Sequence, residues 1–420
     1  MRYAEALEYL FGRRRLGMKY GLDRMKAFLA DMGSPQEAFR TIHVVGTNGK
    51  GSTTALLAET ARLLGFRTGR NTSPHLLDYR ERTAVDSRWI PPEDVASFIT
   101  DYRGLIEKHQ ATFFEITTAM AAWHFARSGV DWAIVEAGLG GRLDATRTFG
   151  GRCTVFTGAD IEHKRILGST KSIIAREKLA IAGRGTILVC HRQSGAVEEA
   201  VRDAVIARGL DRIIPVESGK APLPGRHQLR NAALALAAAR AAFGRSQEEV
   251  DEAFGRACGS LKWPGRLDLR RGGPDILFDV SHNPQSIGGL CAHLDALGRK
   301  PAGVIGFLAD KPWRRMAAML SGYFDPVVAT TPLSDRLLPA SRLGAEFERL
   351  GFRTRIVDPV ESALRTGREL TDDLLVVAGS FYVVGDAMLA AWRNGWMEEP
   401  SGEERQILDT PQDALMPGLH

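Results

Sequence analysis

The chain has 420 residues, of which 44% are hydrophobic and 25% are charged. This composition is typical of globular proteins, and the length predicts two or three domains. The net charge of +5 is mild for this length and no run of Lys and Arg alternates with aromatic residues, so nucleic-acid binding is not expected and a small anionic substrate is favoured.

The cysteines and the hydropathy pattern indicate in which compartment of the cell the protein is expected. The four cysteines, Cys153, Cys190, Cys258 and Cys291, are far apart and form no CxxC pair, which indicates neither a zinc site nor a disulfide framework. The first residues lack the pattern of a secretory signal, and no apolar run is long enough to span a membrane. We therefore expect a cytoplasmic protein without a membrane partner.

The first strong signal along the chain is the segment 41–54, which follows two predicted helices near 3–10 and 22–32. It predicts a buried strand, a glycine-rich turn and the start of a helix. Glycines let backbone N–H groups approach an anion, and a helix start adds unpaired donors. Lys50 could reach the phosphates of a nucleotide, and Ser52 could offer a hydroxyl to Mg²⁺.

The match of this segment to the standard phosphate loop is imperfect. The first glycine of the standard pattern falls on Val44, and the position after the lysine, where Ser or Thr is usual, is Gly51. A tight strand-to-helix turn without a ligand is therefore an alternative interpretation of the same residues.

Strands and helices alternate along the rest of the first half. Helices are predicted at 92–107, 114–127, 172–182, 196–208, 231–243 and 247–258. Strands are predicted within 65–76 and at 80–85, 131–136, 154–157, 185–190 and 213–216. This alternation predicts a mostly parallel sheet with helices on both faces.

Clustered Trp, Pro and Gly residues in 263–274 predict a domain boundary. The alternation then restarts, with strands at 276–280, 303–308, 326–330, 354–357 and 374–378. The predicted fold is α/β, with an N-terminal P-loop NTPase-like domain, 1–268, and a C-terminal Rossmann-like domain, 275–395. The polar, Pro-containing tail, 396–420, is expected to be poorly ordered.

Three polar residues lie near predicted strand ends, which is where parallel sheets bind ligands. Ser73 follows the second strand, Glu136 ends a buried strand, and His163 follows the strand 154–157. A functional role is favoured for Glu136, with an ion pair to Arg142 as the alternative. For a single histidine such as His163, the residues alone favour an ordinary structural position.

Two further groups of residues each have two interpretations. Lys178 belongs to a charged step in an apolar helix, and the residues alone favour an exposed Glu–Lys step. Asp279, His282 and Asn283 lie at a strand end before a helix. Asp279 could hold an amine or a ribose hydroxyl, whereas Asn283 could simply cap the helix.

Several sequence blocks together resemble the folylpolyglutamate synthase/dihydrofolate synthase family, within the Mur ligase superfamily. The resemblance runs from about residue 21 to about residue 385. It rests on HVVGTNGKGSTT, TSPHLL with RER, FFEITTAMA, EAGLGGRLDAT, AREKLAIA, GRHQLRNAALAL, WPGRL, DVSHNP and AGSFYVVG. One such block is weak evidence, whereas their joint occurrence in the family's order is specific.

The resemblance implies an ATP-dependent ligase that uses Mg²⁺ and is expected to be a monomer. Members of this family add L-glutamate to a folate or dihydropteroate carboxylate through an acyl phosphate. One alternative is a Mur-type ligase that acts on another carboxylate, although the segment before the phosphate loop leaves no room for a UDP-binding domain. The other alternative is a P-loop module that binds nucleotide without ligating.

The resemblance also implies roles for individual residues. The triphosphate would be held by Gly49, Lys50, Gly51 and Ser52, and the rest of the nucleotide by Asn231, Arg266 and Asp279. Magnesium would be bound by Ser52, Ser73, Glu136 and His163. Lys178 would be carbamylated, which reverses the interpretation from the residues alone. His282 and Ser380 would lie near the incoming glutamate.

Some positions depart from the family pattern. Arg147 follows DAT, where Asn is usual, and Glu162 precedes the metal-side histidine, where Asp is usual. Asp78 follows TSPHLL, where a basic residue is usual. None of these changes removes an implied phosphate or metal ligand. Arg147 and Asp78 are expected on the approach to the pterin, so they put the choice of substrate in doubt.

Overall fold

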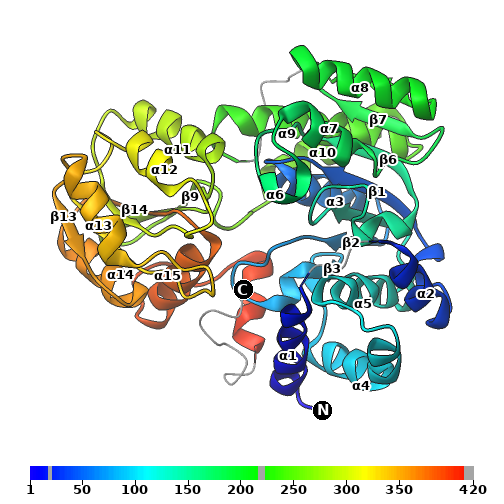
Figure 1. The fold of residues 1–420 in the computed structure, drawn as a ribbon, viewed down its shortest axis with the longest axis horizontal. Helices are drawn as coiled ribbons and strands as arrows, with labels where there is room; N and C mark the ends of the chain where they lie inside the picture. Colours follow the sequence, from blue (N-terminus) through cyan, green and yellow to red (C-terminus); the bar gives the residue numbers. More distant parts are fainter. Residues whose placement is uncertain (18–20, 216–222, 411–420) are drawn as a thin grey trace.

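The computed structural model describes residues 1–17, 21–215 and 223–410. It consists of two α/β halves that lie side by side, with the N-terminal half on the right of Figure 1 and the C-terminal half on the left. Each half is built around one sheet with helices packed on its faces. The predicted α/β fold with mostly parallel sheets is therefore confirmed.

The helices of the N-terminal half are α1 Tyr3–Gly12, α2 Asp23–Asp31, α3 Lys50–Leu63, α4 Pro92–Lys108, α5 Phe113–Arg127, α6 Lys164–Leu167, α7 Lys171–Leu179, α8 Gly195–Arg208, α9 Arg226–Ala242 and α10 Gln247–Ser260. Its strands are β1 Arg40–Val45, β2 Thr68–Asn71, β3 Thr83–Val85, β4 Arg88–Trp89, β5 Trp132–Glu136, β6 Gly151–Phe156, β7 Ile187–Cys190 and β8 Asp211–Ile213. The order in the sheet is β4-β3-β2-β5-β1-β6-β7-β8.

The C-terminal half contains α11 Pro284–Leu297, α12 Trp313–Met319, α13 Ala340–Arg349, α14 Val360–Glu369 and α15 Phe381–Arg393. Its strands are β9 Asp268–Arg270, β10 Asp275–Asp279, β11 Ala302–Ile305, β12 Val327–Ala329, β13 Thr354–Ile356 and β14 Leu374–Ala378. The order in the sheet is β13-β12-β11-β14-β10-β9. Short 3₁₀ helices are η1 Arg13–Leu16, η2 Pro35–Glu37, η3 Tyr79–Arg82, η4 Ala145–Phe149 and η5 Gly402–Asp409.

Strand β1 forms the centre of the N-terminal sheet and pairs in parallel with both β5 and β6. Val44 is in register with Glu136, and Val45 is in register with Phe156. The carboxyl ends of the three strands therefore meet at one edge of the sheet. A central parallel strand is covered on both faces, which explains why every residue of β1 after Arg40 is buried, including the polar Thr41 and His43.

The segment 80–85 differs from the predicted strand. Its first residues form η3, because Asp78 caps this helix and accepts a hydrogen bond from the backbone N–H of Arg80 at 2.8 Å. The Glu81 carboxylate in turn accepts the backbone N–H groups of Leu76, Leu77 and Asp78. Only Thr83–Val85 forms a strand. The alternating pattern therefore came from a capped helical turn joined to a short strand.

The domain boundary lies earlier than predicted. Strand β9 pairs antiparallel with β10, with Phe278 opposite Asp268, so Asp268 belongs to the C-terminal sheet. The prediction placed the end of the first domain at 268, inside this strand. Sequence pattern missed β9 because it is only three residues long and two of them are charged.

The prediction of a poorly ordered tail is wrong for residues 396–410. The helix η5 lies there, and Figure 1 shows it between the two halves, close to the C-terminal mark. Ile407 is buried in the same apolar cluster as Trp89 of the N-terminal half and Met397. Polar composition suggested disorder, but these polar side chains form ion pairs that composition does not reveal. Residues 411–420 lie outside the described part of the chain.

The apolar residues are distributed among several clusters, and one of them crosses between the halves. That cluster joins Leu76, Leu77 and Ala84 to the C-terminal residues Phe278 and Val384. The halves are therefore in extensive apolar contact on one side. Within the described ranges, no helix combines the length and the apolar character required to cross a bilayer.

Candidate active site

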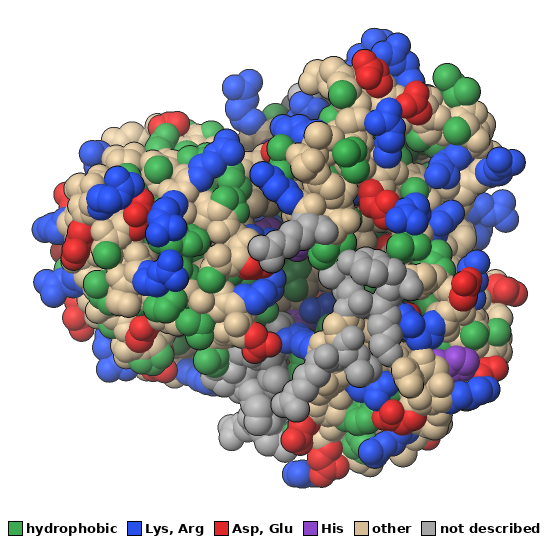
Figure 2. Space-filling view, viewed as in Figure 1, with side chains coloured by type: hydrophobic (Ala, Val, Ile, Leu, Met, Phe, Trp, Pro, Cys, Tyr) green, Lys and Arg blue, Asp and Glu red, His purple; other side chains and the backbone are tan. Residues whose placement is uncertain are grey.

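A cavity of about 670 Å³ lies between the two halves, and residues of both halves line it. Figure 2 shows the corresponding hollow, with Lys and Arg side chains along its rim. Twelve of the thirteen site residues expected from sequence line this cavity: Gly49, Lys50, Gly51, Ser52, Ser73, Glu136, His163, Asn231, Arg266, Asp279, His282 and Ser380. The tertiary structure therefore brings together residues that are separated by up to 331 positions (Gly49 to Ser380).

The phosphate loop connects β1 to α3 at the cavity wall. Gly49 is the N-cap of α3 and has φ of +84°, a backbone conformation that suits glycine. A Cβ at this position would lie 2.3 Å from the Asn231 side-chain oxygen. Among the described residues no side chain caps α3, so its first backbone N–H groups and the positive end of its dipole are available to an anion.

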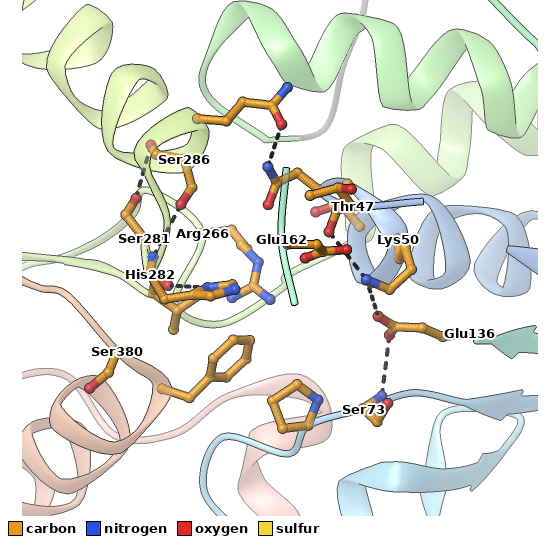
Figure 3. A pocket seen from close by; sticks show the side chains of 18 of the residues that line it. Thr47, Lys50, Ser73, Glu136, Glu162, Arg266, Ser281, His282, Ser286 and Ser380 are labelled. Carbon is orange, nitrogen blue, oxygen red and sulfur yellow. Dashed lines mark hydrogen bonds and ion pairs between the residues drawn. The ribbon is translucent and has the colours of Figure 1, made fainter. Parts of the chain in front are cut away.

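Three of the predicted ligands form a continuous polar group next to this loop. The Lys50 Nζ lies 3.8 Å from Glu136 Oε1 and donates to the Thr47 carbonyl at 3.3 Å. Glu136 Oε2 accepts the backbone N–H of Ser73 at 3.2 Å. Figure 3 shows this chain of contacts along one wall of the cavity. Burial raises the pKa of Glu136, and the Lys50 charge opposes that rise.

Arg142, the alternative ion-pair partner considered for Glu136, pairs with Glu177 instead. Arg142 donates to Glu177 at 2.8 Å, on the outside of the loop. Glu136 therefore faces the cavity with a lysine as its nearest cation, which is the arrangement expected of a residue that binds a ligand or a metal ion.

Lys178 is buried, with only 2% of its surface exposed, so the surface interpretation from the residues alone is wrong. Its Nζ donates to Glu162 Oε1 at 2.7 Å and to the Gly46 carbonyl at 2.8 Å. Burial lowers the pKa of Lys178, while Glu162 acts in the opposite direction. Gly141 approaches this turn so closely that a Cβ there would lie 2.2 Å from the Lys178 carbonyl oxygen.

The residues present are compatible with a magnesium ion held largely by a nucleotide. Within the described ranges, no three His, Cys, Asp or Glu side chains are grouped as a metal site. Glu136 and His163 nevertheless line the cavity, together with the Ser52 hydroxyl and the Glu162 carboxylate. Mg²⁺ commonly takes one or two protein carboxylates and completes its shell with phosphates and water. The donor set therefore fits Mg²⁺ that arrives with a nucleotide.

The C-terminal half contributes the opposite wall. Arg266 lies over the Phe381 ring at 4.9 Å, and its side chain points into the cavity next to His282 in Figure 3. His282 is held by the Val280 carbonyl, 3.0 Å from its Nδ1. Burial and the nearby Lys311 lower the pKa of His282 to about 3, so the ring is neutral. The buried Ser380 caps α15 and accepts the Val383 N–H.

Asp279 and Asn283 both have local structural partners. The two carboxylate oxygens of Asp279 accept the backbone N–H groups of Leu267 at 2.9 Å and Ser281 at 3.0 Å. Asn283 caps α11 by accepting the Ser286 N–H at 2.9 Å, so the capping interpretation is confirmed for this residue. Asp279 still lines the cavity, and its role toward a ribose stays a prediction.

Sequence reasoning missed the residue that joins the two walls. Asn48, in the phosphate loop, donates to Gln285 at 2.6 Å and accepts from Asn283 Nδ2 at 2.8 Å. The Thr157 hydroxyl donates to the Asn48 carbonyl at 2.7 Å. Both residues belong to motifs that the sequence analysis used, because Asn48 lies inside the phosphate loop and Asn283 inside DVSHNP. Their contact across the two halves could not be predicted from those motifs.

Arg14 and Arg82 are among the cavity-lining arginines that were missed as site residues. Arg14 lies 4.3 Å over the Phe11 ring, and Arg82 donates to His75 Nδ1 at 2.7 Å. Burial lowers the pKa of Arg82 to about 10. Arg14 belongs to a run of three arginines at 13–15, and it adds positive charge to the cavity.

Neither of the two departures expected on the approach to the pterin lines the cavity. Asp78 is buried, where it pairs with Arg80 at 3.2 Å and accepts from the Tyr3 hydroxyl at 2.9 Å. Arg147 donates to the Arg142 carbonyl at 2.9 Å, near the outside of the N-terminal half. Both residues stabilise local structure, and neither is among the described residues that line the cavity.

Comparisons with known proteins show which family the chain belongs to. No family model matches the chain. A "Dihydrofolate synthase/folylpolyglutamate synthase" of Mycobacterium tuberculosis is 35% identical over 87% of this chain and 85% of the relative. The chain belongs to the dihydrofolate synthase/folylpolyglutamate synthase family. A "Probable bifunctional folylpolyglutamate synthase/dihydropteroate synthase" of Halobacterium salinarum is 33% identical over 99% of this chain, which spans only 54% of that relative.

Solved structures of this family share the whole fold. FolC of Escherichia coli, in complex with DHPP and ADP, has a TM-score of 0.83 and 26% identity, and the match covers 94% of this chain and 99% of that one. A bifunctional folylpolyglutamate synthase/dihydrofolate synthase with Mn, AMPPNP and L-glutamate bound has a TM-score of 0.82 and 27% identity, covering 93% and 98%.

We predict that Gly49→Ala weakens ADP binding. The alanine would have to adopt a positive φ, at a cost of about 1–3 kcal/mol, and its Cβ would displace the Asn231 side chain. Isothermal titration calorimetry with ADP and Mg²⁺ measures the effect. Gly104→Ala in α4 is the matched control, because no described atom lies within 4 Å of its Cβ position. Equal ADP affinity in both variants would contradict the prediction.

Proposed function

We propose that this protein is an ATP-dependent ligase that adds L-glutamate to a folate or dihydropteroate carboxylate. The observation that carries the proposal is the shared cavity. The uncapped start of α3 and Lys50 form one wall, and Arg266 and His282 form the other. A phosphate donor bound on the first wall would face an acceptor and an amine bound on the second.

The charges of the cavity suit this chemistry. A carboxylate is a poor acyl donor until it is phosphorylated, so the reaction needs a γ-phosphate, an acceptor carboxylate and an amine in one place. All three substrates carry negative charge. Lys50, Arg82 and Arg266 supply positive charge, and the neutral His282 adds a polar group that places no second cation beside the attacking amine.

The relatives support the identity of the substrates. The Escherichia coli FolC structure is a complex with DHPP and ADP, and another family structure contains Mn, AMPPNP and L-glutamate. By analogy, Ser52, Ser73, Glu136 and His163 would hold Mg²⁺. This ion neutralises phosphate charge when it is bound. A monomer in the cytoplasm is the expected state of the protein.

The proposed role of Lys178 requires that its side-chain amine be carbamylated. Its Nζ is buried beside the Gly46 carbonyl, immediately behind the phosphate loop. A carbamate on this nitrogen would add a carboxylate on the metal side of the site. Burial, which lowers the pKa of Lys178, favours the neutral amine that reacts with CO₂.

The first experiment follows phosphate release and product mass with ATP, Mg²⁺ and L-glutamate. Dihydropteroate and tetrahydrofolate serve as alternative acceptors. A mass gain of one glutamate on both acceptors would establish two activities, and a gain on one would establish a single activity. Nucleotide binding without a gain on either acceptor would contradict the proposal and favour a different carboxylate substrate or a non-ligating nucleotide-binding module.

We predict that Lys50→Ala loses turnover by at least about a hundredfold, because the transferred phosphate loses its main side-chain cation. Initial rates of phosphate release at saturating acceptor measure the loss. Lys300→Ala, at an exposed lysine of the other half, is the control and should retain wild-type rates. Near-normal activity of Lys50→Ala would remove the phosphate-loop assignment.

We predict that Lys178→Ala loses most of the activity and regains part of it when small carboxylic acids are added. The added acid would occupy the space of the proposed carbamate. Mass spectrometry of the intact native protein provides a second readout. Arg176→Ala, on the exposed side of the same helix, is the control and should not respond to carboxylic acids. A fully active Lys178→Ala enzyme would exclude the carbamate.

A further inference from the structure

The C-terminal segment 401–410 binds to both halves of the molecule at once. We name it the interdomain clasp. Two consecutive glutamates at its start point to opposite sheets. Glu403 accepts from both terminal nitrogens of Arg70 on β2, at 2.7 and 2.6 Å. Glu404 accepts from Arg270 on β9 at 2.6 Å.

The rest of the clasp fixes it to the edge of the N-terminal sheet. Gln406 accepts the backbone N–H of Trp89 at 2.8 Å and donates to the Ser87 carbonyl at 3.1 Å, in the manner of a neighbouring strand. The Thr410 hydroxyl donates to Asp78 at 2.6 Å. Ile407 is 3% exposed. The clasp is therefore bound by polar and apolar contacts along its length.

The cation of the Arg70–Glu403 pair is buried. Arg70 is 5% exposed, and its guanidinium lies 4.9 Å from the centre of the Trp263 ring. A buried charge needs a partner, because removing one member of such a pair leaves the other without solvation. Glu403 therefore fixes the guanidinium, and the guanidinium provides a flat surface on which Trp263 rests.

Trp263 connects this pair to the nucleotide side of the cavity. Its Nε1 lies 3.4 Å from the position of a Cβ on Gly51, so the indole packs against the first turn of α3. Three residues later the same linker carries Arg266, which lines the cavity. A smaller cavity between clasp and linker shares Pro74, Arg266 and Phe381 with the main cavity.

We propose that Glu403 is a positioning residue for nucleotide binding, acting through Arg70 and Trp263 on the first turn of α3 and on Arg266. The ion pair holds the linker 262–266 against the phosphate loop and thereby completes the cavity from the C-terminal side. This inference goes beyond the proposed function, and it rests on that function only where nucleotide affinity is the readout.

The test compares Glu403→Gln with Glu399→Gln in the full chain. Both changes remove one carboxylate, but Glu399 is exposed a few residues before the clasp. Amide hydrogen exchange is measured without ligand, so it does not depend on the proposed function. In Glu403→Gln we expect faster exchange in the first turn of α3 and in 262–267. An increase confined to 401–410, or the same pattern in Glu399→Gln, would overturn the proposal.

A second variant separates positioning from overall stability. Arg70→Met/Glu403→Met removes both charges and keeps apolar volume, a change that is often neutral for the stability of a buried pair. We expect its melting temperature to be near that of the wild type and its Kd for Mg-ADP to rise on the order of tenfold, because Trp263 and Arg266 lose their support. A wild-type Kd in this variant would overturn the proposal.

The two hypotheses can fail separately. If the wild-type protein does not bind Mg-ADP, the proposed function fails, and hydrogen exchange in the linker still decides the role of Glu403. If the wild type binds Mg-ADP and Glu403→Gln shows neither faster exchange nor weaker binding, only the positioning role fails.

Discussion

The structure depends on the start of α3, a helix terminus without a side-chain cap that lies at the wall of the cavity. Backbone N–H groups at a helix start are costly when they are buried without a partner. At α3, the described residues provide no such cap, and Gly49 brings the backbone to the cavity surface. An anion is the natural partner for this terminus. The neighbouring side chains can be understood as arranged around that anion.

Charge placement follows from this constraint. Lys50 contacts Glu136 at 3.8 Å, which is close enough to favour the ionised carboxylate against the effect of burial and too long for a strong hydrogen bond. The Glu162 carboxylate lies 2.7 Å from Lys178 Nζ behind the loop. Both of these carboxylates therefore have a lysine beside them, and the Lys50–Glu136 pair is loose enough to accept a phosphate or a metal ion between its members.

Assembly from two halves adds a second requirement. The phosphate loop and the residues of the opposite wall must be held at a defined separation, because groups that react together need close positioning. Asn48 provides one direct link, through Asn283 and Gln285. The clasp provides another on the far side of the linker. Both links consist of polar contacts that could break and re-form if the halves move.

The sequence by itself determined the α/β alternation and the phosphate loop, because periodic burial and glycine-rich turns are local features. Its family resemblance also pointed to twelve residues that line the cavity. Only the tertiary structure decided the burial of Lys178, the start of the second sheet at Asp268 and the order of the tail. Each of these depends on a partner far away in the chain. Glu403, for example, is in the sequence one of several polar residues of the tail. Its role is visible only in the fold, where Arg70 of β2 forms an ion pair with it.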